Sequence, residues 1–299
     1  MKKLMTIFPV LSGIMWGSAG IFVRTLTNLG MDAYTVVSTR VVVAVLLILG
    51  WLCIFDKSYL KIRIKDAWIF VITGLIGMFA INLCYNFAIQ DLTLSLAAVL
   101  LSMSPIFVLI LAALFFKEKI TERKVICMVL AFAGCALVSG VFEHSSGMQW
   151  TPRGIFLGLL AAFFYAIYSL VSKVAMKRGY HAYTITFYSL LSVMIIVLPL
   201  TDWQITLDVV KTGGIGMILF MVLHSLCASV LSYILFTVSL EYIDAGKASI
   251  LAACEPIAAM IFGVIFFAEM PTILSVMGLV VAVIAITIMT LPEKNNYSH

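Results

Sequence analysis

Charged side chains are scarce in this sequence. Only 11% of the 299 residues are Asp, Glu, Lys or Arg, whereas 63% are hydrophobic. A soluble domain carries about 25% charged and about 45–50% apolar residues. One core of this size cannot bury such an excess of apolar side chains, so most of them must face lipid. The mean hydropathy of +1.15 agrees with this, and the sequence predicts an integral membrane protein.

Motifs of enzyme chemistry are also missing. The four histidines are far apart and lack metal-ligand spacing, and the six cysteines form no CxxC pair. There is no phosphate-binding glycine-rich loop, no nucleophile elbow and no Walker sequence. We therefore expect no enzyme, no bound metal or cofactor, and no built-in ATP motor. The net charge of +5 is spread over short clusters between apolar segments, a pattern that does not favour nucleic-acid binding.

Ten apolar segments are long enough to cross a bilayer as helices, which takes about 20 residues each. Short links containing charged, glycine or proline residues separate them and leave little room for a soluble domain. The expected helices are residues 4–24, 33–55, 67–89, 93–116, 124–142, 154–174, 182–200, 214–240, 247–268 and 272–291. The predicted fold class is an all-α integral membrane protein with ten transmembrane helices.

The basic residues indicate how these helices are oriented. With an inside N-terminus, all but four of the 19 lysines and arginines fall in inside loops or at inside helix ends. The positive-inside rule then predicts a multi-pass protein of the bacterial inner (plasma) membrane with both termini in the cytoplasm. The four exceptions are Arg24, Arg40, Arg153 and Lys211.

An internal repeat relates the two halves of the chain. Gly30–Thr35 matches Gly179–Thr184 at an offset of 149 residues, and Pro105 matches Pro256 at an offset of 151. Because each unit has five helices, an odd number, the two copies must have opposite orientations. Inverted repeats are typical of secondary transporters with a site near the midplane. We predict a first five-helix repeat over 1–142, an external linker over 143–153, a second repeat over 154–291 and a cytoplasmic tail over 292–299.

Several short motifs follow one another along the two halves. They are Trp16-Gly17, Arg40, Ala98 through Pro105, Phe116-Lys117-Glu118, Glu255-Pro256 and Phe267-Ala268-Glu269. Together they resemble the drug/metabolite transporter superfamily, in its ten-helix exporter branch with two EamA-type units, over residues 6–291. The resemblance implies a central cavity lined mainly by the first, third, fourth, sixth, eighth and ninth helices. It also implies export of amino acids or other small metabolites, with no bound cofactor.

Two charged residues fall inside predicted helices. Charges in hydrocarbon are costly and usually face a cavity or a partner. Arg40 either lines the cavity, where it would meet a substrate carboxylate, or snorkels to the headgroups. Glu255 is a candidate for binding an ammonium group. For its carboxyl, protonation, pairing, hydrogen bonding at the helix break and proton coupling all remain open. Ser104 occupies the position before the first proline that Glu255 occupies before the second, so the two halves differ chemically there.

The remaining candidates are aromatic, amide and hydroxyl side chains in the helices that the resemblance assigns to the cavity. Interhelical hydrogen bonds explain many such groups equally well, and the histidine among them is a weak indication of pH dependence. The two prolines, Pro105 and Pro256, are expected as hinges or as static bends. With Arg40 and Glu255, the predicted substrate-binding set is Trp16, Asn82, Tyr85, Asn86, Ser104, Tyr165, Tyr168, Ser169, His224, Ser232 and Tyr233.

The expected function is a secondary transporter that exports small metabolites, with amino acids as the first expectation, by alternating access around a midplane cavity. Its partners are then a small-molecule substrate and the lipid bilayer. Coupling to protons and the choice between monomer and homodimer stay open. One alternative is an importer of a nucleobase, vitamin or other small solute. The alternative from another class is a membrane sensor or scaffold without transport.

Overall fold

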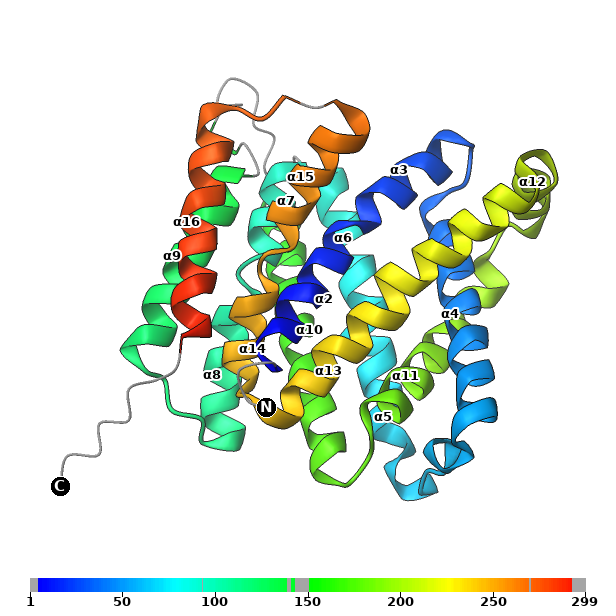
Figure 1. Ribbon diagram of the computed structural model, residues 1–299, viewed down its shortest axis with the longest axis horizontal. Helices are drawn as coiled ribbons and strands as arrows, with labels where there is room; N and C mark the ends of the chain where they lie inside the picture. The colour runs from blue at the N-terminus through cyan, green and yellow to red at the C-terminus, as the bar shows by residue number, and fades with distance from the viewer. Residues whose placement is uncertain (1–4, 93, 139–140, 143–150, 269, 292–299) are drawn as a thin grey trace.

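The computed structural model describes residues 5–92, 94–138, 141–142, 151–268 and 270–291. Every regular element in these ranges is helical (Figure 1). Nine helical segments there are long and apolar enough to cross a bilayer. The 17-residue helix α9 completes the ten helices expected from the sequence. The predicted all-α membrane fold is therefore confirmed. Most of the predicted linker, the predicted tail and Glu269 lie outside the described residues.

Each repeat is built from five membrane segments, several of them composed of two shorter helices. The first repeat contains α2 (Ile7–Gly17) with α3 (Ala19–Asn28), α4 (Ala33–Phe55), α5 (Ala67–Gly74) with η3 (Leu75–Ala80) and α6 (Ile81–Asp91), α7 (Leu94–Leu101) with α8 (Ser104–Phe116), and α9 (Glu122–Val138). The second contains α10 (Pro152–Lys177), α11 (Ala182–Val197), α12 (Trp203–Ser225) with η5 (Leu226–Leu231) and α13 (Ser232–Tyr242), α14 (Ala245–Ala252) with α15 (Glu255–Phe267), and α16 (Ile273–Thr290).

The backbone irregularities repeat between the two halves. The π-helical turns η3 and η5 start 151 residues apart, in the third and eighth segments. The left-handed residues Lys117 (φ 55°) and Ala268 (φ 53°) end α8 and α15 with the same offset. Gly30 (φ 93°) and Gly179 (φ 87°) occupy equivalent turns, where glycine adopts a positive φ without steric cost. The internal repeat seen in the sequence is therefore also a repeat of backbone geometry.

The fourth and ninth segments are broken rather than bent. The residues at the two breaks have almost the same conformation, with φ/ψ of −77°/−5° at Met103 and −77°/−3° at Cys254. Pro105 and Pro256 follow in the first turn of α8 and α15. A proline there removes no intrahelical hydrogen bond, because the first N–H groups of a helix have no partner within it. We expected a kink within one continuous helix at each proline, and the structure has two half-helices there instead.

Close helix contacts explain part of the small-residue pattern in α2. A Cβ atom added at Gly13 would lie 2.5 Å from the carbonyl oxygen of Ala252, and one at Gly17 would lie 2.6 Å from that of Glu255. The backbone of α2 therefore rests directly on the broken ninth segment, as small residues allow in membrane helices. A Cβ at Gly20 would meet no described atom within 4 Å.

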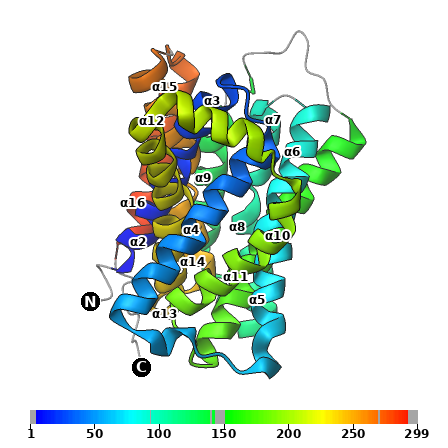
Figure 2. The ribbon, with the colours of Figure 1, turned by 90° about the vertical axis from the view of Figure 1, so that its right-hand side faces the viewer.

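One helix begins earlier in the chain than the sequence predicted. We expected the eighth helix to begin at residue 214, but α12 begins at Trp203. The Asp202 side chain accepts hydrogen bonds from the backbone N–H groups of Gln204 and Ile205, which caps this extra segment. Gly214, with φ 59° and ψ −149°, then interrupts the helix. Figure 2 shows α12 changing direction beside α3 and α4.

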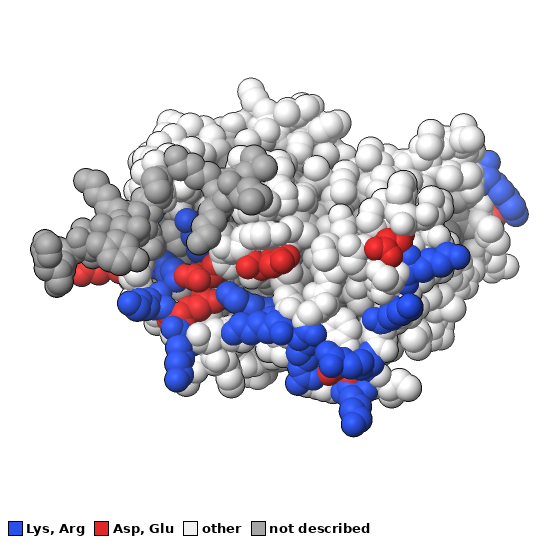
Figure 3. Space-filling model, turned by 60° about the horizontal axis from the view of Figure 1, so that its bottom comes forward, with Lys and Arg blue, Asp and Glu red and all other residues white. Residues whose placement is uncertain are grey.

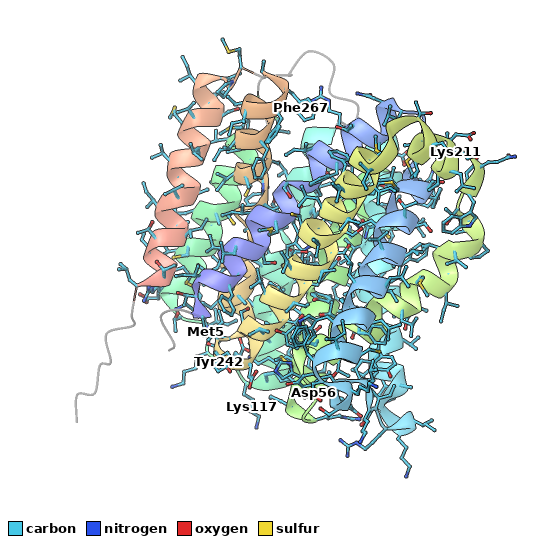
Figure 4. The ribbon with its side chains drawn as sticks, turned by 45° about the vertical axis from the view of Figure 1, so that its right-hand side comes forward. Met5, Asp56, Lys117, Lys211, Tyr242 and Phe267 are labelled. Carbon is cyan, nitrogen blue, oxygen red and sulfur yellow. The ribbon has the colours of Figure 1, made fainter. Side chains whose placement is uncertain are left out.

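The two ends of the helical bundle differ in charge. Met5, Asp56, Lys117 and Tyr242 lie at one end, and Lys211 and Phe267 lie at the other (Figure 4). Figure 3 shows lysines and arginines gathered on the first of these ends. We call this the basic end. Its loops and helix ends carry Lys57, Lys61, Arg63, Lys65, Lys117, Lys119, Arg123, Lys124, Lys173, Lys177, Arg178 and Lys247.

Candidate functional site

Five aromatic side chains from α2, α10 and α13 form a cluster inside the bundle. Trp16 is central: its ring lies 5.3 Å from that of Tyr233, 5.6 Å from that of Phe236 and 6.1 Å from that of Tyr165. Tyr168 completes the cluster, 5.3 Å from Tyr233. Edge-on and tilted arrangements of this kind are the favourable ones for aromatic pairs. Trp16, Tyr165 and Tyr233 stay partly exposed and can therefore contact a solute.

Glu255 lies next to this aromatic cluster. It is the first residue of α15, where the positive end of the helix dipole favours a carboxylate. Its side chain is partly exposed, and Gly17, the neighbour of Trp16, packs on its backbone carbonyl. In the described part of the chain, Glu255 makes no side-chain hydrogen bond and no ion pair. A carboxyl group inside a membrane protein thus has no hydrogen-bond or ion-pair partner among the described residues.

Arg40 lines a narrow pocket between α4, η3, α6, α11, η5 and α13. The pocket has a volume of about 10 Å³, which is room for about one water molecule. The guanidinium makes no hydrogen bond or ion pair with any residue that the structure describes, and its Nε atom is buried. The pocket is lined by Val37, Arg40, Val41, Met78, Phe79, Asn82, Leu190, Val193, Ser229 and Tyr233. We call it the Arg40 pocket.

A second narrow pocket adjoins the first and leads away from the basic end. The two share Val37, Phe79 and Asn82 as lining residues. The second pocket adds Ala33 and Tyr34 at the start of α4, together with Leu83, Asn86 and Val197. The three polar candidates Arg40, Asn82 and Asn86 therefore follow one path, which starts near Tyr233 and runs toward the end of the bundle opposite the basic end.

Five of the predicted substrate-binding residues are buried and line neither pocket. Tyr168 is 1% exposed, and its hydroxyl oxygen lies 2.9 Å from Thr237 Oγ1 in a hydrogen bond. His224 is buried and stacks on Phe22 with ring centroids 5.0 Å apart. Ser104, Ser169 and Ser232 are also buried. The eight partly exposed candidates are Trp16, Arg40, Asn82, Tyr85, Asn86, Tyr165, Tyr233 and Glu255.

Sequence reasoning did not find the ion pairs that join the two repeats at the basic end. Lys173 Nζ donates to Glu118 Oε1 at 2.7 Å, and the same carboxylate accepts hydrogen bonds from the N–H groups of Ala245 and Gly246. Glu118 therefore caps α14 of the opposite repeat, not the helix that precedes it. Two further links are Lys124 with Asp244 at 2.7 Å and Asp66 with Arg178.

The internal repeat could have predicted that the two repeats contact each other at these positions. Lys173 Nζ lies 5.7 Å from the centre of the Phe116 ring, and Arg24 Cζ lies 4.4 Å from that of Phe267. Arg24 matches Lys173, and Phe116 matches Phe267, at the offsets of the internal repeat. The two cation–π contacts are therefore equivalent contacts, related by the internal repeat. Pairing each base with the aromatic residue of the other repeat would have predicted both contacts.

Known proteins resemble this chain over nearly its whole length. It is 26% identical to the uncharacterized transporter YxxF of Bacillus subtilis (strain 168), over 99% of this chain and 93% of that protein. It is also 26% identical to the pseudopaline exporter CntI of Pseudomonas aeruginosa, over 75% of each chain. A solved crystal structure superposes with a TM-score of 0.77 at 12% identity, covering 95% of both chains, which shows the fold.

The family comparison covers both halves separately. The pattern of the EamA-like transporter family matches residues 3–140 and again residues 152–291. This double match agrees with the two five-helix repeats and with the absence of enzyme motifs. The protein is a multi-pass membrane transporter and not an enzyme. By these two matches, the chain belongs to the EamA-like transporter family of the drug/metabolite transporter superfamily.

Proposed function

We propose that this transporter exports small metabolites that carry both an amino and a carboxyl group, amino acids among them. The observation that carries the proposal is the pair of opposite charges, Arg40 and Glu255, inside the bundle. Neither forms an ion pair or hydrogen bond within the described chain. An unpaired charge in such surroundings is costly and is usually functional. A substrate with a carboxylate for Arg40 and an ammonium group for Glu255 would compensate both charges.

Alternating access is the proposed mechanism. The inverted repeats supply two conformations that exchange when the halves exchange their shapes. The breaks before α8 and α15 and the π-helical turns η3 and η5 lie in the segments that carry the candidate site, and such irregular positions tolerate backbone movement. In the structure the ion pairs of Glu118, Lys124 and Asp66 join the two repeats at the basic end. Opening that end requires those three links to break.

The charge distribution supports the orientation of the chain, and one relative supports export as the direction. The concentration of lysines and arginines at the basic end favours a cytoplasmic position for this end, and with it for both termini. A relative at 26% identity is named as an exporter, of pseudopaline. Protons are a candidate coupling ion, because Glu255 is a carboxyl group at the centre of the site without a fixed partner.

The test is counterflow into liposomes that contain the purified protein. Each labelled amino acid is offered outside liposomes preloaded with the same unlabelled compound, and a nucleobase serves as the alternative substrate. Glu255→Gln and Arg40→Gln should each reduce accumulation by about tenfold or more, because each removes a charge-assisted contact. Arg153→Gln is the matched control, since Arg153 lies at the exposed end of α10 with its side chain 70% exposed.

The outcomes separate the candidate functions. Accumulation of an amino acid that depends on both charges supports the proposal. Accumulation of the nucleobase alone would favour the alternative substrate class. If folded protein accumulates none of the tested solutes, the proposed substrate class is wrong. Proton coupling is tested in the same liposomes by imposing a pH gradient and comparing wild type with Glu255→Gln.

A further inference from the structure

We infer that the Arg40 pocket binds one chloride ion between the two repeats while no substrate is bound. The ion occupies the pocket before a substrate carboxylate reaches Arg40, so this binding site goes beyond the proposed function. Three properties of the pocket support it: its position between the repeats, the hydrogen-bond donors in its wall and its volume.

The pocket lies where equivalent positions of the two repeats face each other. α4 of the first repeat and α11 of the second pack together (Figure 2), and both contribute to the wall. Three pairs of lining residues are equivalent at the repeat offsets of 149 and 151 residues: Val41 with Leu190, Met78 with Ser229, and Asn82 with Tyr233. Transporters with inverted repeats bind substrates and coupling ions at such an interface. An ion held in this pocket contacts both repeats at once.

The positive charge and the unpartnered hydroxyl of the pocket come from different repeats. Arg40 belongs to α4, and its equivalent in α11 is Ser189, which does not line the pocket. Ser229 belongs to η5, and its equivalent in η3 is Met78, whose thioether cannot donate a hydrogen bond. Neither repeat alone therefore provides the site, which forms when the two repeats pack together.

The polar groups in the wall suit an anion and not a cation. None of the described lining residues is acidic, and the four polar ones can all donate hydrogen bonds, namely Arg40, Asn82, Ser229 and Tyr233. Ser229 is 0% exposed, and its hydroxyl has no partner among the described residues. Asn82 Nδ2 donates one hydrogen bond to the Met78 carbonyl at 2.8 Å, which leaves its second N–H for a ligand. A guanidinium, a hydroxyl and an amide together provide the charge-assisted hydrogen bonds that stabilise a buried anion.

The volume of the pocket selects a small anion. It is about 10 Å³, which is room for about one water molecule. A monatomic ion such as chloride is close to that size, whereas a carboxylate with its attached chain needs more space. A water molecule fits as well, but it carries no charge to compensate the guanidinium, and an uncompensated charge inside the bundle is costly. The apolar side chains in the rest of the wall lower the local dielectric and strengthen the attraction between the ion and Arg40.

Chloride and substrate then compete for Arg40. This consequence rests on the proposed function, in which Arg40 binds the substrate carboxylate. The substrate must displace the ion, and the pocket must widen to admit the larger group. The ion compensates the guanidinium whenever the transporter lacks its substrate.

The experiment measures chloride binding to the full-length protein without substrate. Purified protein in detergent is dialysed to equilibrium against radioactive chloride, while gluconate keeps the ionic strength constant. We expect saturable binding of one ion per chain. Unlabelled bromide should compete, because it is also monatomic, whereas sulfate should not compete, because it is too large for the pocket. In crystals soaked in bromide, the anomalous signal should lie in the Arg40 pocket.

Three variants locate the ion. Arg40→Gln should weaken chloride binding by about a hundredfold, because it removes the charge together with its hydrogen bonds. Ser229→Ala should weaken binding by about tenfold, the effect of one lost hydrogen bond to a charged group, and it tests the site even where Arg40→Gln fails to fold. Ser189→Ala is the matched control and should bind chloride as wild type does, since Ser189 is equally buried and has an unpartnered hydroxyl in the described chain but does not line the pocket.

The outcomes separate the ion site from the proposed function. Absence of chloride binding to folded wild-type protein, or binding that Arg40→Gln and Ser229→Ala leave unchanged, would overturn the inference, whatever the counterflow assay shows. Competition is measured separately: at a chloride concentration about ten times its dissociation constant, half-saturation for the transported amino acid should rise about tenfold. Chloride binding that depends on Arg40 but leaves half-saturation unchanged would support the ion site and remove Arg40 from the substrate contacts of the proposed function.

Discussion

The broken segments of the two repeats have the same backbone and different chemistry. α7 and α8 are joined through the same conformation as α14 and α15, and each second half-helix begins with a proline in its first turn. Before that proline, the first repeat has the buried Ser104 and the second has the partly exposed Glu255. The comparison teaches that the two repeats share the backbone of the break, whereas the candidate site residue at the break does not repeat.

The first helix of each repeat, α2 or α10, also differs between the repeats at one position. Gly17 of α2 touches the backbone at Glu255, and its equivalent in the second repeat is Ala166 of α10. A glycine therefore packs on the acidic break, whereas an alanine occupies the equivalent position in the second repeat. The asymmetry of the two breaks therefore extends to the helices packed on them.

The largest expected effect comes from breaking the link between repeats at the basic end. Glu118→Ala leaves Lys173 without its partner, although the two side chains are only 9% and 14% exposed, and removes the cap of α14. Loss of one member of a buried pair costs about 3–5 kcal/mol. The unfolding midpoint in detergent should fall strongly. The exposed Glu122, replaced by alanine, should leave it unchanged; equal effects of the two variants would contradict this role for Glu118.

The second prediction concerns a substitution that makes α2 and α10 alike at this position. Gly17→Ala copies Ala166 into the first repeat and places a methyl group against the carbonyl oxygen of Glu255, so α2 must move away from α15. Overpacking of this kind costs about 1–3 kcal/mol. We expect a lower unfolding midpoint and reduced counterflow. Gly20→Ala, which adds its methyl group in open space, is the control, and a loss of equal size there would refute the contact.

The third prediction concerns a hydrogen bond that occurs in the second repeat alone. Tyr168 bonds Thr237, while their equivalents in the first repeat are Ala19 and Asn86, and Asn86 lines the outer pocket. Tyr168→Phe should cost about 0.5–1.5 kcal/mol, the net value of one buried hydrogen bond. Substrate half-saturation should stay near that of wild type, because Tyr168 is buried. A selective loss of substrate affinity would instead make Tyr168 a contact residue. Tyr242→Phe, at an exposed site, is the control.

The smallest effect on stability is expected at the prolines. Pro105→Ala and Pro256→Ala each change the first turn of a half-helix, where proline and alanine are both tolerated, so each should cost less than about 1 kcal/mol. Measured unfolding midpoints should therefore be similar for the two variants. Counterflow should respond more to Pro256→Ala, because Glu255 directly precedes that proline. Equal transport losses would mean that the two breaks contribute as hinges in the same way.

Much of the fold could be predicted because membrane spans leave strong local signals. Apolar length located ten helices, and motifs such as those around Gly30 and Gly179 revealed the repeat. The segment before Gly214 was missed because its amphipathic pattern lacks the continuous apolar length of a span. The breaks at Pro105 and Pro256 were expected as kinks, since a proline in sequence does not tell whether the preceding residues stay helical.

The candidate site was predicted less completely than the fold. Arg40 and Glu255 stood out because charges are rare in hydrocarbon. Hydroxyl-bearing residues such as Tyr168 and Ser232 did not reveal which side of a helix faces the site. Their burial depends on how α10, α13 and α2 pack, and sequence spacing within one helix does not contain that information.

By itself, the sequence determined that this protein is a ten-helix membrane transporter with two inverted repeats. These properties follow from hydropathy, charge distribution, internal similarity and the resemblance of short motifs to a transporter family, all of which can be read along the chain. The tertiary structure alone decided that Arg40 shares a pocket with Tyr233, that Gly17 packs on the backbone of Glu255, and that Glu118 caps the helix of the other repeat. Such relations join residues more than a hundred positions apart, and the packing of the helices brings them together.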